Sequence, residues 1–272
     1  MTAGLPTLLG LPYDASSSYL RGSAAAPRAI REALHSPAGN SWSEALLEVL
    51  APGALADAGD LALSLNPAEA RAAIEAGVGK VIAAGGRPIS LGGDHSVSYP
   101  VLRAVRAAHP RLTILHLDAH ADLYDEFEGD RYSHACPFAR IMEEKLCDRL
   151  VQVGIRTLTA HQRAQADRFG VEIVDMRAWA AGTRPVLAGP VYLSLDLDVL
   201  DPAFAPGVSH WEPGGLSTRD VLGLIQGLPV SLVGADIVEL NPARDPSGIT
   251  AMVAAKFVKE IASRMLATDH RA

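Results

Sequence analysis

The sequence predicts an α/β protein in which a mostly parallel sheet is covered by helices on both faces. Short apolar segments of strand character alternate along the chain with helical patterns, as in sheets of this kind. At 272 residues the chain is long enough to bury a substantial core. It contains no linker, internal repeat or low-complexity tract, so we expect a single domain over residues 1–272.

In the first half of the chain, capping residues and prolines set the expected helix limits. Pro27 fits the first turn of a helix, because proline has no N–H that would need a partner. Asn66 and Ser96 are expected N-caps, Pro67 starts the second helix, and Pro110 ends the third. In order, the expected elements are strand 7–12, helix 26–34, helix 67–84, strand 87–91, helix 96–109 and strand 112–117.

The second half repeats this alternation. Apolar runs mark its strands, and Ser217 is the expected N-cap of its penultimate helix. In order, the expected elements are helix 134–146, strand 151–155, helix 159–169, strand 171–174, strand 191–195, helix 217–228, strand 230–238 and helix 248–267.

The composition excludes several classes of protein. Hydrophobic residues make up 49% of the chain and charged residues 20%, which is typical of a globular protein. The net charge of −7 argues against a nucleic-acid partner. No apolar segment is long enough to cross a bilayer and the N-terminus lacks a signal-peptide pattern, so we expect a cytoplasmic protein. Cys136 and Cys147 are too few for a disulfide framework or zinc knuckle.

Three polar residues follow the apolar stretch 113–117 at alternate positions: Asp118, His120 and Asp122. Alternate side chains of an extended chain share a face, so these three are expected to converge. Two carboxylates and an imidazole in one place repel each other or stay protonated unless a cation lies between them. The triplet alone is also compatible with a solvated loop or a capping turn.

Two further strand ends carry the same residue types. Asp196 and Asp198 follow strand 191–195, and His95 lies in a glycine turn after strand 87–91. Parallel strands gather their carboxyl ends at one edge of the sheet, so all three segments can share one site. Four aspartates and two histidines exceed a tetrahedral zinc site and suit two divalent ions such as Mn²⁺, which would lower the pKa of a shared water.

These segments resemble the three signature motifs of the ureohydrolases, the family of arginases and agmatinases. The motifs are Gly92–Ser96, Asp118–Asp122 and Ser194–Pro202. The resemblance implies a three-layer arginase-like α/β fold and an enzyme that uses two Mn²⁺ ions and a metal-bridging hydroxide. It also implies that a guanidino substrate is cleaved to an amine and urea, and that the chain forms a homo-oligomer, a trimer or hexamer.

The same resemblance suggests roles for individual residues. It implies that His95 binds one ion with Asp118, Asp122 and Asp198, and that His120 binds the other with the aspartates, Asp196 included, without fixing the exact partition. His134 lies in a segment where the family keeps a proton-transfer histidine, with Asp122 as a possible relay. Glu239 lies where the family binds the guanidinium. Without the resemblance, His134 is also compatible with a helix-starting histidine and Glu239 with a turn-stabilising acid, while His116 is read as structural.

Substrate choice depends on a loop that is rich in acidic residues. The loop contains one basic residue, Arg131, and four acidic residues: Asp125, Glu126, Glu128 and Asp130. This negative charge favours a substrate with two positive charges over one with a carboxylate. The loop and residues 10–14 also resemble agmatinases, so agmatine, cleaved to putrescine and urea, is the expected substrate. His210 and Trp211 depart from that pattern.

Other functions remain open. Within the fold they are those of a guanidinobutyrase, an arginase, or a formiminoglutamase that releases formamide. Outside this group they are those of a zinc deacetylase and of a noncatalytic metal-binding subunit.

Overall fold

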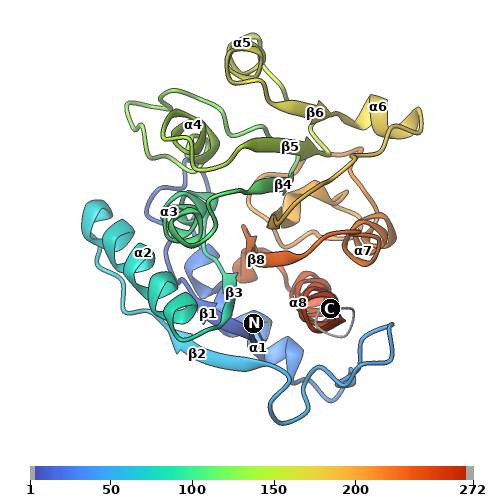
Figure 1. Cartoon of the computed structure of the whole chain (residues 1–272). Coiled ribbons are helices and arrows are strands. Elements are labelled where there is room, and N and C mark those ends of the chain that lie inside the picture. Colours follow the sequence, from blue (N-terminus) through green and yellow to red (C-terminus); the bar gives the residue numbers. More distant parts are fainter. Residues whose placement is uncertain (1–3, 268–272) are drawn as a thin grey trace.

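A single parallel sheet forms the centre of the protein. The computed structural model describes residues 4–267, and within them eight strands lie in the order β2-β1-β3-β8-β7-β4-β5-β6, from the bottom to the top of Figure 1. Every neighbouring pair of strands is parallel. The strands are β1 Pro6–Gly10, β2 Ala56–Asp60, β3 Arg87–Leu91, β4 Thr113–Leu117, β5 Arg149–Val153, β6 Glu172–Val174, β7 Val191–Asp196 and β8 Leu232–Val238.

Helices cover both faces of the sheet and complete three layers, which confirms the predicted α/β fold. Helices α2, α3 and α4 lie on one face, and α1, α7 and α8 lie on the other (Figure 1). Side chains of β4 alternate between the two faces of the sheet. Ile114 packs into the core on the side of α2, α3 and α4, and Leu115 packs into the core on the side of α1, α7 and α8. The helices are α1 Ala26–Leu34, α2 Pro67–Ala83, α3 Ser98–Ala108, α4 Pro137–Glu143, α5 Ala160–Phe169, α6 Met176–Ala180, α7 Thr218–Gln226 and α8 Ile249–Ala267.

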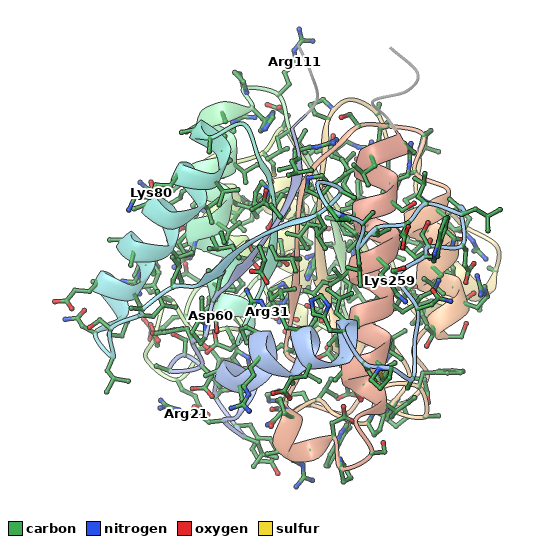
Figure 2. All side chains as sticks on the ribbon, turned by 90° about the horizontal axis from the view of Figure 1, so that it is seen from below. Arg21, Arg31, Asp60, Lys80, Arg111 and Lys259 are labelled. Atoms are coloured by element: carbon green, nitrogen blue, oxygen red, sulfur yellow. The ribbon has the colours of Figure 1, made fainter. Side chains whose placement is uncertain are left out.

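Strand β2 was not predicted, because its sequence has no apolar run. It forms an edge of the sheet, and four of its five residues are exposed, so its side chains need not be apolar. Arg31 of α1 holds it in place through Asp57, at 2.7 Å, and Asp60. Figure 2 shows Arg31 and Asp60 side by side. The short helix α6 was likewise missed.

Helix α4 begins at Pro137, not at His134 as predicted. Proline suits a first helical turn, and the residues before it form a turn in which Cys136 N–H donates to Ser133 O, at 2.9 Å. His134 therefore lies in a loop ahead of the helix, where its side chain is free to face the carboxyl edge of the sheet.

The predicted N-cap of α2 is confirmed. The side chain of Asn66 accepts hydrogen bonds from the backbone N–H groups of Ala68 and Glu69, at 3.0 and 3.3 Å. Replacing Asn66 by Ala is expected to lower the free energy of unfolding by about 1 kcal/mol, because these N–H groups would lose their partner. Urea denaturation measures the change. A loss below about 0.3 kcal/mol would show that water replaces the cap.

Among the helices within residues 4–267, none combines the length and the apolar character needed to cross a membrane.

Candidate active site

The predicted site residues follow four strands that are neighbours in the sheet. The order β3-β8-β7-β4 places the carboxyl ends of these strands side by side. His95 begins a 3₁₀ turn after β3, and Glu239 directly follows β8. Asp196 ends β7, Asp198 lies in the 3₁₀ turn Leu197–Val199 that follows, and the triplet 118–122 follows β4.

The glycine turn that carries His95 packs directly on the first loop. A Cβ on Gly93 would lie 1.6 Å from Tyr13 O, so only glycine fits there. The next residue, Asp94, donates its N–H to the same carbonyl oxygen, at 2.9 Å. Its carboxylate accepts hydrogen bonds from Ser16 N–H and Ser96 N–H, at 3.0 and 3.1 Å. Asp94 thus holds the loop and the turn together.

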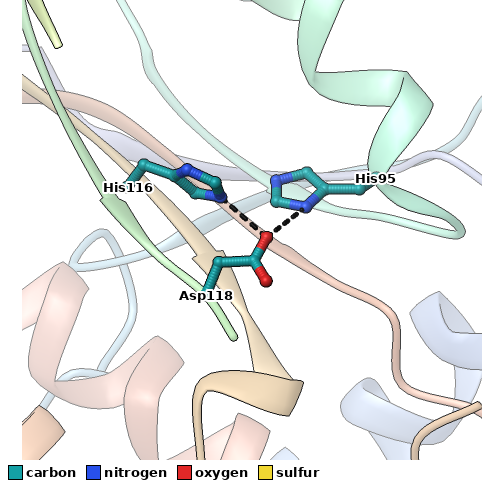
Figure 3. A group of neighbouring side chains, drawn as sticks. All are labelled: His95, His116 and Asp118. Atoms are coloured by element: carbon teal, nitrogen blue, oxygen red, sulfur yellow. Dashed lines mark hydrogen bonds and ion pairs between the residues drawn. The ribbon is translucent and has the colours of Figure 1, made fainter. Parts of the chain in front are cut away.

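Three carboxylates surround one ring nitrogen of His95. His95 Nδ1 lies 3.1 Å from an Oδ2 atom of each of Asp118, Asp122 and Asp196. All four side chains are buried, and Nδ1 makes no hydrogen bond within the described residues. Figure 3 shows the side chains of His95, from the turn after β3, and Asp118, directly after β4, pointing toward each other.

The tautomer of His95 follows from its other ring nitrogen. Nε2 lies 3.0 Å from Ser194 Oγ, and this hydroxyl donates its hydrogen to Asp236 Oδ1, at 2.7 Å. Ser194 must then accept a hydrogen from Nε2, which leaves a lone pair on Nδ1. Asp236 is held in turn by Tyr192 OH, at 2.8 Å. One nitrogen and three carboxylate oxygens therefore converge as acceptors, which suits a divalent cation.

The charges of the cluster around His95 also indicate that a cation would be stabilised there. Burial, followed by the charges of Asp198 and Asp118, raises the pKa of Asp196 well above its usual range. Burial acts to lower the pKa of His95, but its three carboxylate neighbours outweigh burial and raise that pKa well above its usual value. Without a metal the cluster would bind protons instead, so a metal at this place would displace them.

A second cluster lies on the other side of Asp118. His120 Nδ1 is 2.9 Å from Asp198 Oδ2 and 3.4 Å from Asp118 Oδ1. The two oxygens of Asp118 thus face different histidines, as in a carboxylate that bridges two ions. The distances distinguish two aspartates whose partition the sequence left open: Asp196 lies beside His95, whereas Asp198 lies beside His120.

His134 and Glu239 form a buried pair next to these clusters. His134 Nδ1 lies 2.8 Å from Glu239 Oε1, which also accepts the N–H of His95 at 2.9 Å. The opposite nitrogen, Nε2, lies 2.8 Å from Ser18 Oγ. Burial acts to lower the pKa of His134, but the charge of Glu239 and the hydrogen bond to it raise the pKa to about 9.

Two of these residues have unusual backbone conformations. Asp122 and Glu239 have φ angles of 51° and 65°, in the left-handed region that side chains other than glycine seldom adopt. Such conformations cost of order 1–3 kcal/mol and are concentrated at functional sites. Here they turn both carboxylates back over the sheet edge.

A cavity of about 270 Å³ opens above the two clusters. Its inner end is lined by predicted residues: His120, Asp122, His134, Asp196, Asp198 and Glu239. Its outer part is lined by residues that were not predicted: Ser18, Tyr124, Phe127, Ala135, Thr157, Gln162, His210 and Glu212. Most of these lie in loops and Gln162 lies in the first turn of α5; no role was predicted for any of them from the sequence, although His210 was noted as a departure from agmatinases.

Comparison with known proteins identifies the family. The model of the arginase family matches residues 6–263, nearly the whole chain. The chain belongs to the arginase family.

Relatives within the arginase family include enzymes with different substrates. Arginase 1, mitochondrial, of Arabidopsis thaliana is 48% identical over 95% of this chain and 80% of its own length. An agmatinase of Halalkalibacterium halodurans is 37% identical over 93% and 90%. The solved structure of arginase from Medicago truncatula superposes with a TM-score of 0.91 and 44% identity, covering 97% of this chain and 88% of that one.

The family assignment makes this protein a hydrolase of the arginase and agmatinase group, as the sequence motifs predicted. The inferred special likeness to agmatinases is weaker, because the identities to arginases are higher. Residues of the chain that can hold a metal are brought together, which is consistent with the two-metal chemistry of this family.

The acidic residues of the loop, which favoured agmatine in the sequence, do not line the cavity. Asp125 is neutralised by Arg131 and by Arg140 of α4, at 3.0 and 2.9 Å. The loop residues that line the cavity are the aromatic Tyr124 and Phe127. The partner Arg140 lies 15 residues along the chain, in a helix, so this pairing was not visible in the local sequence.

Proposed function

We propose that the protein hydrolyses arginine to ornithine and urea, with two manganese ions held by His95, His120 and the four aspartates. The observation that carries this proposal is the part of the cavity lining beyond the metal residues, which offers groups for both the α-ammonium and the α-carboxylate of an amino acid. Glu212 supplies a carboxylate for an ammonium group, and Gln162 supplies an amide. Gln162 Oε1 accepts the N–H of Thr159, at 3.5 Å, so its NH₂ group is left for a carboxylate.

Glu239 is suited to hold the guanidinium. Both hydrogen bonds to this carboxylate in the described structure fall on Oε1, which leaves Oε2 for a ligand in the cavity. A guanidinium pairs well with a carboxylate, and one such contact at the cavity floor would orient its central carbon toward the metal site. The left-handed backbone at Glu239 gives this side chain its direction.

His134 is suited to protonate the departing amine. Its raised pKa favours protonation of the imidazole, whose Nδ1 contacts Glu239 and whose Nε2 accepts the N–H of Ser18, at 3.2 Å, in this structure. When bound, the two divalent ions would supply Lewis acidity that lowers the pKa of a water in the site. Asp122 lies 3.1 Å from His95 and lines the cavity, so it can contribute both to metal binding and to proton movement.

The higher identity to arginases than to an agmatinase also supports arginine as the substrate. Agmatine is the second candidate. No lysine or arginine lines the cavity in the described part of the chain, and Glu212 would accept the ammonium end of agmatine equally well.

A substrate panel tests the proposal. The manganese-loaded protein is expected to release urea from arginine with a kcat/KM at least about tenfold above that for agmatine and guanidinobutyrate, because only arginine uses both outer groups. Formamide release from formiminoglutamate is measured in parallel. Glu212→Gln should narrow the preference for arginine over guanidinobutyrate. Turnover led by agmatine would reject the role assigned to Gln162.

A further inference from the structure

His116 lies against one of the proposed metal ligands without belonging to the ligand set. It is fully buried in β4, and its Nε2 atom is 2.8 Å from Asp118 Oδ2, the same oxygen that faces His95 (Figure 3). The ring of Phe138 stacks on the imidazole, with 3.8 Å between centroids. The imidazole is therefore fixed in position and cannot turn away from Asp118.

The tautomer of His116 is set by Gln152 of the neighbouring strand β5. Gln152 Nε2 lies 3.0 Å from His116 Nδ1 and 2.7 Å from Ala121 O. The carbonyl oxygen of Ala121 accepts hydrogens only, so the NH₂ group of the amide must face it. The second amide hydrogen then points to Nδ1, which has to be the unprotonated nitrogen of a neutral ring.

A buried acceptor is left without a partner by this arrangement. Gln152 Oε1 makes no hydrogen bond within the described residues. Turning the amide of Gln152 over would place Oε1 against Ala121 O, and two acceptors repel each other. The amide therefore keeps its orientation even though Oε1 stays without a hydrogen bond. The unpaired oxygen indicates that the two hydrogen bonds donated by Gln152 Nε2, to Ala121 O and His116 Nδ1, determine how this side chain is placed.

His116 is consequently a hydrogen-bond donor and not a metal ligand. With Nδ1 accepting from Gln152, the ring hydrogen lies on Nε2 and points at Asp118 Oδ2. His95, His116 and Asp118 lie close enough together to resemble a metal site of their own, but a protonated nitrogen has no lone pair for a cation. Of the two imidazoles facing Asp118 Oδ2, only His95 can bind metal.

We infer that Gln152 and His116 are positioning residues that hold the bridging carboxylate of Asp118 in the orientation that faces both histidine clusters. Gln152 orients the His116 ring, and His116 donates to Oδ2, which leaves Oδ1 directed toward His120. Without this hydrogen bond the carboxylate of Asp118 could rotate, and one of its oxygens would no longer face His95 or His120. The inference rests on the metal centre of the proposed function but not on the substrate.

Metal affinity tests the inference in the full-length protein. His116→Leu should raise the apparent Kd for Mn²⁺ about 10- to 100-fold, the usual effect of removing a hydrogen bond to a ligand. Gln152→Leu should raise it less, because the imidazole remains. The double variant should lose less affinity than the sum of the two single losses, because Gln152 acts partly through His116 and partly through Ala121 O. Competition with a fluorescent chelator gives the Kd, and electron paramagnetic resonance reports the coupling of the two ions.

Matched controls separate positioning from packing. His109→Leu makes the same substitution at the end of α3, away from the cluster, and should leave the Kd unchanged. Thermal unfolding of the metal-free variants shows whether they fold, and Gln152→Leu keeps the test valid should His116→Leu fail to do so. A Kd within twofold of the starting protein in either variant, or additive losses in the double variant, would overturn the inference. Absence of manganese binding by the starting protein would instead overturn the metal centre itself.

Discussion

Replacing Asp118 with Ala is expected to lower kcat/KM by at least about a thousandfold, because this change removes the carboxylate shared by both histidine clusters. Each of its oxygens faces a different histidine, so no other single aspartate should have as large an effect. Metal content, measured by elemental analysis after dialysis, should fall from two ions to one or none. Asp118→Asn keeps the side-chain shape and isolates the loss of charge.

Glu126→Ala is the control for Asp118→Ala. Glu126 is an exposed carboxylate in the adjacent loop and lies outside the cavity, so its loss should change neither metal content nor turnover. Retention of two tightly bound ions by Asp118→Ala would show that the bridging role is wrong.

Replacing His134 with Ala is expected to reduce kcat by about 10²- to 10⁴-fold while metal content stays at two ions. The imidazole contacts Glu239 and Ser18 and none of the proposed ligands, so its removal should affect proton transfer and not metal binding. A urea-release assay at neutral pH and saturating substrate measures kcat. Loss of metal from this variant would contradict the assigned role.

The pH dependence gives a second test of His134. Burial acts to lower its pKa, but Glu239 outweighs burial and raises the pKa to about 9, so the charged form should be favoured at neutral pH and lost as the pH rises through about 9. The alkaline fall of kcat/KM should follow this titration and should move to lower pH in Glu239→Gln, which lacks the charge that stabilises the imidazolium.

Much of the site was predictable because it depends on topology alone. Once the strands are parallel, His95, Asp118 and Asp196 must meet at one edge, whatever the details of packing. Which aspartate faces which histidine depends on side-chain rotamers, so the sequence left the partition of Asp196 and Asp198 open. Strand pattern also missed β2, since an exposed edge strand needs no apolar residues.

The outer part of the cavity could not be predicted, because loops from distant parts of the chain form it. Ser18 and Gln162 lie in segments that no local pattern connects to the metal clusters. The acidic loop illustrates the same limit: the charge of Asp125 was visible in the sequence, but its partner Arg140 became apparent only in the fold. Substrate preference depends on such long-range pairs more than on any motif.

The position of β8 has a consequence for how the enzyme is made. This strand is the last of the sheet to be synthesised, yet it lies in the middle, between β3 and β7. Without it, the sheet would divide into β2-β1-β3 and β7-β4-β5-β6, and no strand pairing would join the segment carrying His95 to the segments carrying the aspartates. The strand pairing that aligns the candidate metal ligands is therefore completed only after nearly the whole chain has been made.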